Sequence, residues 1–144
     1  MRLGCISALL LFSAVAPAIA EKRIIQPKEF APGGPFNPAV LVDGTLYVSG
    51  QIGRDLKTQK VPENFDAEVR QVLDNIGIIL REAKMDYADV VSVQVYLTDM
   101  SLFQRMNTIY TTYFKTDRPS RTTVGVAKLA APEAHIEITV TAHH

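Results

Sequence analysis

The sequence predicts one α+β domain in which two helices cover a single face of a β-sheet. Two segments have the helical spacing of apolar residues, β-prone runs lie before, between and after them, and a hairpin signal opens the series. With 47% hydrophobic and 21% charged residues among 144, the composition is that of one folded domain with one core. The predicted order of elements is ββαβαββ.

Residues 1–20 have the features of a signal peptide. Arg2 is followed by an uncharged apolar run over 3–15, and Ala18-Ile19-Ala20 matches the small-x-small pattern of a cleavage site. An uncleaved membrane anchor is the alternative, but the run is shorter than the roughly 20 apolar residues that cross a bilayer. We therefore predict cleavage, export to the periplasm or the outside medium, and no stable membrane anchor afterwards.

Residues 21–144 form the predicted single domain. The one cysteine, Cys5, lies in the cleaved segment, so the domain has neither a disulfide nor thiol chemistry. The whole chain has 15 basic and 15 acidic residues and therefore lacks the positive field that binds nucleic acid. Nucleic acid is not an expected partner.

The first part of the domain combines chain breakers with a hairpin. A short β-prone segment over 23–25 precedes a loop rich in proline and glycine, 26–38, which is a candidate wall for a pocket. Two apolar runs, 39–42 and 45–49, then flank Asp43-Gly44, a dipeptide typical of tight hairpin turns.

Two segments are predicted to be helical. Asn64 is placed to cap a helix over 64–84, and Ser101 with Gln104 has the spacing of a capping box for a second helix that ends at Phe114. The spaced apolar residues are Phe65, Val69, Val72, Ile76, Ile79, Leu80 and Ala83 in the first segment and Phe103, Met106, Ile109, Tyr110 and Tyr113 in the second.

The remaining strands leave one sheet face without helices. Residues 91–97 alternate between apolar and mixed positions, and the strand-like runs 120–129 and 135–142 are joined by a turn-prone segment, 130–134. Two helices cover only one face of a sheet of about five strands. The other face is predicted to carry Gln94, Tyr96, His135, Glu137, Thr139 and Thr141. This semi-polar set favours packing against other subunits, and a plain solvated face is the alternative.

The domain offers little to a metal ion. Beyond residue 20 its histidines are His135, His143 and His144, the last two at a terminus that is expected to be a solvated tail, and it has no cysteine. Neither a phosphate-binding Gly loop nor a nucleophile elbow or His-based triad is present. The sequence therefore predicts no metal site.

Arg121 and Glu137 are the leading candidates for chemistry. Arg121 begins a strand, where its planar and always charged guanidinium group suits a carboxylate. Glu137 lies between two isoleucines, so its side chain belongs to the semi-polar face, where a carboxylate can orient a water molecule or accept a proton. Spacing alone is equally compatible with a cross-strand ion pair between these two residues.

Six motifs occur in a fixed order along residues 23–142. They are Tyr47-Val48-Ser49-Gly50-Gln51-Ile52, Val72-Leu73-Asp74-Asn75-Ile76, Val93-Gln94-Val95-Tyr96-Leu97-Thr98-Asp99, the segment Asn107 to Phe114, Arg118-Pro119-Ser120-Arg121-Thr122-Thr123-Val124 and Ile136-Glu137-Ile138. In this combination the chain resembles the Rid family, also called the YjgF-type family of reactive-intermediate deaminases.

The resemblance implies a fold, an assembly and a reaction. The fold would be chorismate-mutase-like with one mixed sheet, and the assembly a homotrimer with its helices outside and three clefts between subunits. The reaction would be a cofactor-free hydrolytic deamination that converts 2-imino or enamino acids, of the 2-aminoacrylate type, to 2-oxo acids and ammonium.

The resemblance also assigns roles to residues. Arg121 matches the arginine that holds the substrate carboxylate, and Glu137 matches the glutamate that positions the attacking water. Ser49 and Gly50 match residues beside the bound ligand, and Asn107 matches an asparagine near the cleft.

Two positions depart from the family pattern. Phe36 stands where many deaminating members have tyrosine, so it walls the pocket without a hydroxyl group, and Thr123 stands where many have cysteine. A trimer that binds a small carboxylate in the same clefts without turnover is the alternative function. The nuclease activity ascribed to some Rid relatives is disfavoured by the near-zero net charge.

Overall fold

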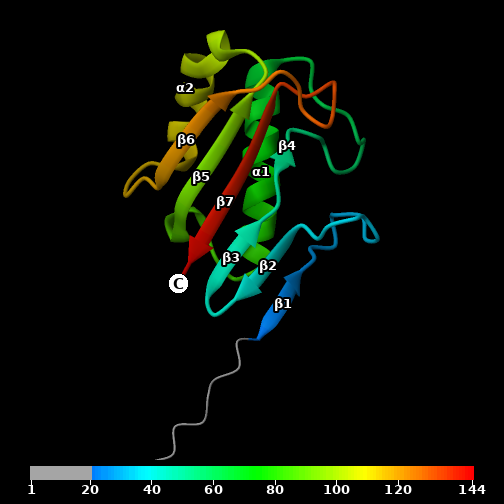
Figure 1. The fold of residues 1–144 in the computed structure, drawn as a ribbon, viewed down its shortest axis with the longest axis vertical. Helices are drawn as coiled ribbons and strands as arrows, with labels where there is room; N and C mark the ends of the chain where they lie inside the picture. Colours follow the sequence, from blue (N-terminus) through cyan, green and yellow to red (C-terminus); the bar gives the residue numbers. More distant parts are fainter. Residues whose placement is uncertain (1–20) are drawn as a thin grey trace, which may run out of the picture.

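The computed structural model describes residues 21–144 as one mixed sheet with two helices on one face (Figure 1). The predicted signal peptide, residues 1–20, lies outside the described residues. The strands are β1 (Lys22–Ile25), β2 (Ala39–Val42), β3 (Thr45–Val48), β4 (Gln51–Ile52), β5 (Val90–Leu97), β6 (Ser120–Gly125) and β7 (Ile136–His143). The helices are α1 (Phe65–Glu82) and α2 (Phe103–Tyr113), with 3₁₀ turns η1 (Tyr87–Asp89) and η2 (Met100–Leu102).

The strands lie in the order β1-β2-β3-β7-β5-β6, with β4 also paired to β7. The pair β5 and β6 is parallel and all other pairs are antiparallel, so the sheet is mixed as predicted. The sheet has seven strands, more than the five or so expected, because β1 and β4 also pair. The predicted strand 120–129 stops at Gly125, since its partner β5 ends at the paired Leu97.

The hairpin between β2 and β3 is confirmed. Asp43 and Gly44 both have positive φ angles, 46° and 73°, as a tight hairpin turn requires. The C-terminal histidines are exposed, as expected, but they do not form a free tail. His143 is the last residue of β7 and pairs with Thr45 of β3, so the final strand extends beside the hairpin.

The start of α1 is confirmed and the start of α2 is not. The Asn64 side chain accepts hydrogen bonds from the backbone N–H groups of Asp66 and Ala67, at 2.9 and 3.2 Å. The predicted capping box at Ser101 is wrong, because the chain enters α2 through the turn η2. The carboxylate of Asp99 caps that turn by accepting the backbone N–H of Ser101 at 2.8 Å, and α2 itself has no side-chain cap.

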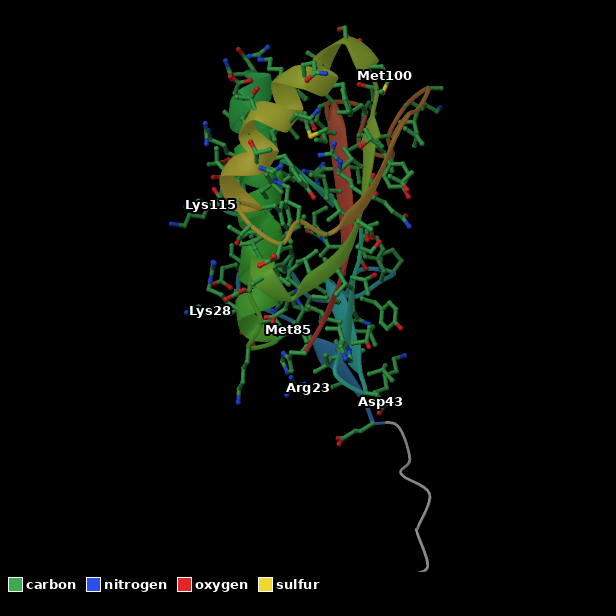
Figure 2. All side chains as sticks on the ribbon, turned by 90° about the vertical axis from the view of Figure 1, so that its left-hand side faces the viewer. Arg23, Lys28, Asp43, Met85, Met100 and Lys115 are labelled. Carbon is green, nitrogen blue, oxygen red and sulfur yellow. The ribbon has the colours of Figure 1, made fainter. Side chains whose placement is uncertain are left out.

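The core lies between the sheet and the two helices. Figure 2, turned by 90° from Figure 1, shows both helices on one side of the sheet and none on the other. The largest buried side chains come from both layers and include Leu46, Leu73, Ile76, Ile79, Leu80, Leu97, Met106, Ile136 and Ile138. The opposite side is the open face of the sheet.

One residue predicted for the open face is elsewhere. His135 precedes β7 and its ring lies 2.9 Å from the carboxyl group of Glu68 on α1, so the strand alternation does not reach it. Gln94, Tyr96 and Glu137 do lie on the open face, since they alternate with buried residues that pack under the helices.

Candidate functional site

The sheet separates the predicted site residues into two groups. Arg121 pairs with Val93, which is buried under the helices, whereas Glu137 pairs with Tyr96 on the open face. Paired residues of neighbouring strands point to the same face. Arg121 and Glu137 therefore point to opposite faces, and β5 lies between their strands. This excludes the cross-strand ion pair that spacing left open.

The first group is the one that contains Glu137, and it surrounds a cavity of about 720 Å³. Phe36, Ser49, Gly50 and Glu137 all line it, so four of the seven predicted site residues meet here. The loop between β1 and β2 forms one wall, as its proline and glycine content suggested. A smaller cavity of about 380 Å³ also touches Gly50 and Glu137, so the Glu137 carboxylate lies between two hollows on the open face.

Ser49 ties this loop to the end of β3. Its hydroxyl group donates to the carbonyl of Asn37 at 2.7 Å, and its backbone N–H donates to the carbonyl of Pro38 at 2.9 Å. Phe36, just before these residues, keeps 68% of its surface exposed, far more than a core phenylalanine. The loop thus presents an aromatic side chain at the cavity while its own backbone is held.

Gly50 allows the close approach of Glu137. A Cβ atom at position 50 would overlap Oε1 of Glu137, so only glycine leaves room for the carboxylate in this position. Burial raises the pKa of Glu137 above its ordinary value, because the partly apolar surroundings disfavour the charged form. A carboxyl group with a raised pKa in a cavity is suited to proton transfer.

The second group lies between β6 and α2. Nη2 of Arg121 donates to Oδ1 of Asn107 at 2.8 Å, which joins two of the predicted residues. The guanidinium group stacks 4.5 Å from the ring centre of Tyr110 and 5.7 Å from that of Phe103. Thr123, two residues along β6, points to the same face as Arg121. These contacts fix the guanidinium group, so little further ordering would be needed for it to bind an anionic group.

Two hydroxyl groups in this second group have unused hydrogen-bonding capacity. Among the described residues, the hydroxyl groups of Tyr110 and Thr123 are buried without a partner. Burial raises the pKa of Tyr110, and the adjacent charge of Arg121 opposes this effect. Buried polar groups are normally paired, so these two hydroxyl groups beside the guanidinium group are able to accept or donate a further hydrogen bond.

Sequence reasoning missed the residues that hold the walls of the cavity. Asn75 of α1 is almost fully buried and donates to the carbonyls of Ile52 and Arg54, at 3.2 and 2.9 Å. Arg54, also in the cavity wall, pairs with Glu133 at 2.6 Å. The available signal was a polar residue, Asn75, on the apolar side of a predicted helix, which indicates a buried polar contact.

Residues 21–144 contain neither a group of potential metal ligands nor a helix suited to a membrane. No cluster of three or more residues able to hold a metal ion was found there. No helix in this part of the chain is long and apolar enough to cross a membrane.

Comparisons with known proteins agree over most of the chain. The profile of the family described as Endoribonuclease L-PSP matches residues 26–144. A RutC family protein from Aquifex aeolicus is 41% identical over 123 residues, which cover 84% of this chain and 98% of the relative. The human 2-iminobutanoate/2-iminopropanoate deaminase is 43% identical over 111 residues, which cover 75% and 80% of the two chains.

A solved structure supports the fold directly. The protein YyfA of the Rid family from Yersinia pestis superposes with a TM-score of 0.82 at 33% identity, over 86% of this chain and all of its own. Sequence and structure thus agree, and the chain belongs to the Endoribonuclease L-PSP family, which includes the Rid (YjgF-type) and RutC proteins.

Proposed function

We propose that this protein is a cofactor-free hydrolytic deaminase that converts 2-imino or enamino acids of the 2-aminoacrylate type to 2-oxo acids and ammonium. Mammalian relatives named 2-iminobutanoate/2-iminopropanoate deaminase, at 41–43% identity, support this reaction class. The observation that carries the proposal is the carboxyl group of Glu137, which has a raised pKa and lies over Gly50 at the cavity.

The proposed reaction needs an anchor and a base. Arg121 binds the substrate carboxylate with its guanidinium fork, and the Glu137 carboxylate accepts a hydrogen bond from a water molecule. The water oxygen attacks the carbon of the protonated imine while Glu137 takes one proton of the water, which gives a carbinolamine. Glu137 returns this proton to the nitrogen. The carbinolamine hydroxyl group then gives its proton to Glu137 as the carbon–nitrogen bond breaks, and the released ammonia takes that proton and departs as ammonium, so a 2-oxo acid remains. Ser49, Asn107 and Thr123 are proposed to line the bound substrate.

The two groups of site residues can meet only between copies of the chain. Arg121 is on the outermost strand of the sheet, and Glu137 is on the open face. That face also exposes Ile24, Tyr47 and Val124, which keep 41%, 55% and 40% of their surface accessible. Exposed apolar groups on one face are typical of subunit contacts. We therefore propose a homotrimer in which Arg121 of one subunit faces Glu137 of the next.

Export remains part of the proposal. Cleavage after Ala20 would release a domain that begins at Glu21, one residue before β1. Fractionation of expressing cells, followed by N-terminal sequencing of the protein, tests this. Exported protein that begins at Glu21 is expected, and protein that retains Met1 would contradict the proposal.

A direct assay tests the reaction. An amino-acid oxidase generates the imine in solution, and the appearance of 2-oxo acid is followed with and without the protein. The wild type is expected to accelerate hydrolysis. Arg121→Lys is expected to raise KM by about tenfold to a hundredfold, because it loses a charge-assisted hydrogen bond of the guanidinium fork. Glu137→Gln is expected to lower kcat by about 10² to 10⁴ with little effect on KM.

The same variants separate catalysis from binding alone. A non-catalytic binder would be stabilised thermally by a 2-oxo acid, and Arg121→Ala would abolish that stabilisation, but no imine would be turned over. Ligand-dependent stabilisation of the wild type without acceleration would therefore contradict the deaminase proposal.

A further inference from the structure

Helix α1 buries one carboxyl group, that of Glu68, and directs it at the start of β7. Glu68 has no exposed surface. Its Oε1 accepts the backbone N–H of His135 at 2.7 Å and that of Ile136 at 3.3 Å, and its Oε2 lies 2.9 Å from Nδ1 of His135. Both oxygens are thus occupied by two consecutive residues of one segment.

A buried carboxyl group is energetically unfavourable at a core position. Removing such a group from water costs free energy that hydrogen bonds only partly return, and an apolar side chain of similar size often serves stability equally well. Two neighbours of Glu68 on the same helix, Val69 and Val72, are apolar and fully buried. Core packing alone therefore does not explain a carboxyl group at position 68, and its hydrogen bonds need a separate explanation.

The contacts of Glu68 converge on the position of Glu137. The two N–H groups that it accepts belong to the residues immediately before Glu137. Its backbone also packs against the strand on the other side, since a Cβ atom at Gly53 would overlap the carbonyl oxygen of Glu68. The residue before Gly53 is Ile52, which pairs with Glu137. Glu68 thus touches both segments that frame the Glu137 carboxyl group.

We propose that Glu68, locked by the His135 ring, is a positioning residue that sets the register and direction of Glu137 in the cavity. The inference rests on the proposed function, because it assigns Glu68 a role through the residue that handles the water. Glu68 itself does not contact the substrate. Its effect is to hold the backbone N–H groups of His135 and Ile136, at the start of β7, so that the next side chain lies over Gly50.

Three variants test the proposal in the full chain. Glu68→Leu removes all acceptors and leaves two backbone N–H groups unpaired. It is expected to lower kcat on the order of 10²-fold with KM within about twofold of wild type, since small misplacements of catalytic groups have such effects. Glu68→Gln keeps Oε1 as an acceptor and is expected to restore most of kcat. His135→Ala removes only the ring contact and is expected to have an intermediate kcat.

A matched control separates positioning from stability. Val69→Ala or Val72→Ala, whichever matches the loss of Tm in Glu68→Leu, is expected to keep wild-type kcat. Equal kcat in Glu68→Leu and this control would overturn the proposal. If the leucine variant does not fold, His135→Ala decides, because the ring is half exposed. A several-fold fall in kcat at unchanged Tm supports the proposal, and wild-type kcat overturns it.

A second readout does not depend on turnover. The protein is labelled with ¹³C at its glutamate carboxyl groups, and the NMR signal of Glu137 is assigned by its loss in Glu137→Gln. This signal is then titrated in the wild type and in Glu68→Leu. If Glu68→Leu does not fold, His135→Ala takes its place. A pKa of Glu137 that moves in the variant supports positioning, and an unchanged pKa overturns it. A wild type without deaminase activity would contradict the proposed function, and this titration would still decide what Glu68 does.

Discussion

At the scale of single residues, the proposed site depends on how closely backbone and side chain approach. Gly50 leaves the space that the Glu137 carboxyl group fills, and Ser49 beside it holds the loop that carries Phe36. On the other face of the sheet, Asn107 and Tyr110 hold Arg121 in one orientation. Each charged group therefore has its position fixed by neighbours on its own face before any ligand is bound.

Gly50→Ala is expected to displace the Glu137 carboxyl group, because the added methyl group would occupy the space of Oε1. The expected result is a fall in kcat on the order of 10²-fold, measured in the imine assay. The double variant with Glu137→Gln is the control. If the glycine acts through Glu137, adding Gly50→Ala to Glu137→Gln lowers kcat no further, and additive losses would contradict this.

The raised pKa of Glu137 predicts how stability and activity depend on pH. Its ordinary pKa is 4.5, and the folded state holds the proton to higher pH than the unfolded state. The stability that this group contributes is therefore fully present below pH 4.5 and is lost as the pH rises through the folded pKa. Glu137→Gln should raise Tm at neutral pH and leave it unchanged in acid. A higher Tm of this variant in acid as well would contradict the assignment.

The activity of the wild type should increase with pH, whereas the stability contributed by Glu137 decreases. The ionised carboxylate accepts the proton of water, so kcat/KM of the wild type is expected to increase with pH through the raised pKa. The acid limb of the pH profile should lie above the 4.5 of an ordinary glutamate. An acid limb at or below this value would assign the base to another group.

At the scale of elements, α1 does more than cover the sheet. Its two buried polar residues, Glu68 and Asn75, are seven positions apart and therefore lie on one side of the helix, two turns from each other. Glu68 accepts N–H groups at the start of β7, and Asn75 donates to carbonyls at the end of β4. These are the two strands that meet at Glu137, so the placement of α1 determines the geometry of the cavity.

The cap of α1 should contribute to stability without affecting chemistry. Asn64→Ala leaves two N–H groups of the first turn without their side-chain acceptor and is expected to lower the free energy of unfolding by about 1 kcal/mol. Asn64→Asp keeps the acceptor and should stay close to wild type in urea denaturation. Equal losses in both variants would show that the cap is not the source of the effect.

At the scale of the whole molecule, the site is divided between two faces of one sheet. Arg121 lies under α2 at one edge, and Glu137 lies on the open face. A substrate that contacts both residues must lie between two copies of the chain. In the proposed mechanism, catalysis therefore requires the association of subunits.

Mixing two inactive variants tests this requirement. Arg121→Ala and Glu137→Gln homotrimers are each expected to be inactive, but mixed trimers contain interfaces with an intact Arg121 and an intact Glu137 from different subunits. After denaturation and joint refolding at equal amounts, about a quarter of wild-type activity is expected, since each half of an interface is intact half the time. Activity no higher than that of the separate variants would place both residues in one subunit's site or in none.

The sequence predicted most elements because its signals are local. Asp43-Gly44 specifies a turn through its own φ angles, and Asn64 caps a helix through N–H groups two and three residues away. Alternation in β5 and β7 likewise placed Glu137 on the open face. The prediction of a capping box at Ser101 was wrong because a neighbouring residue, Asp99, caps the turn η2 instead.

Such local signals predicted the fold class, and the resemblance carried by the six ordered motifs indicated the family and the roles of the candidate residues. Tertiary structure alone decided the order of the strands, and with it the relation between Arg121 and Glu137. Spacing could not distinguish a cross-strand ion pair from separate positions, because strand pairing depends on contacts between distant segments. β5 lies between β6 and β7, and its register with them, Val93 opposite Arg121 and Tyr96 opposite Glu137, placed the two charges on opposite faces. For the same reason, only the folded chain brought Glu68 to the start of β7, 67 residues away.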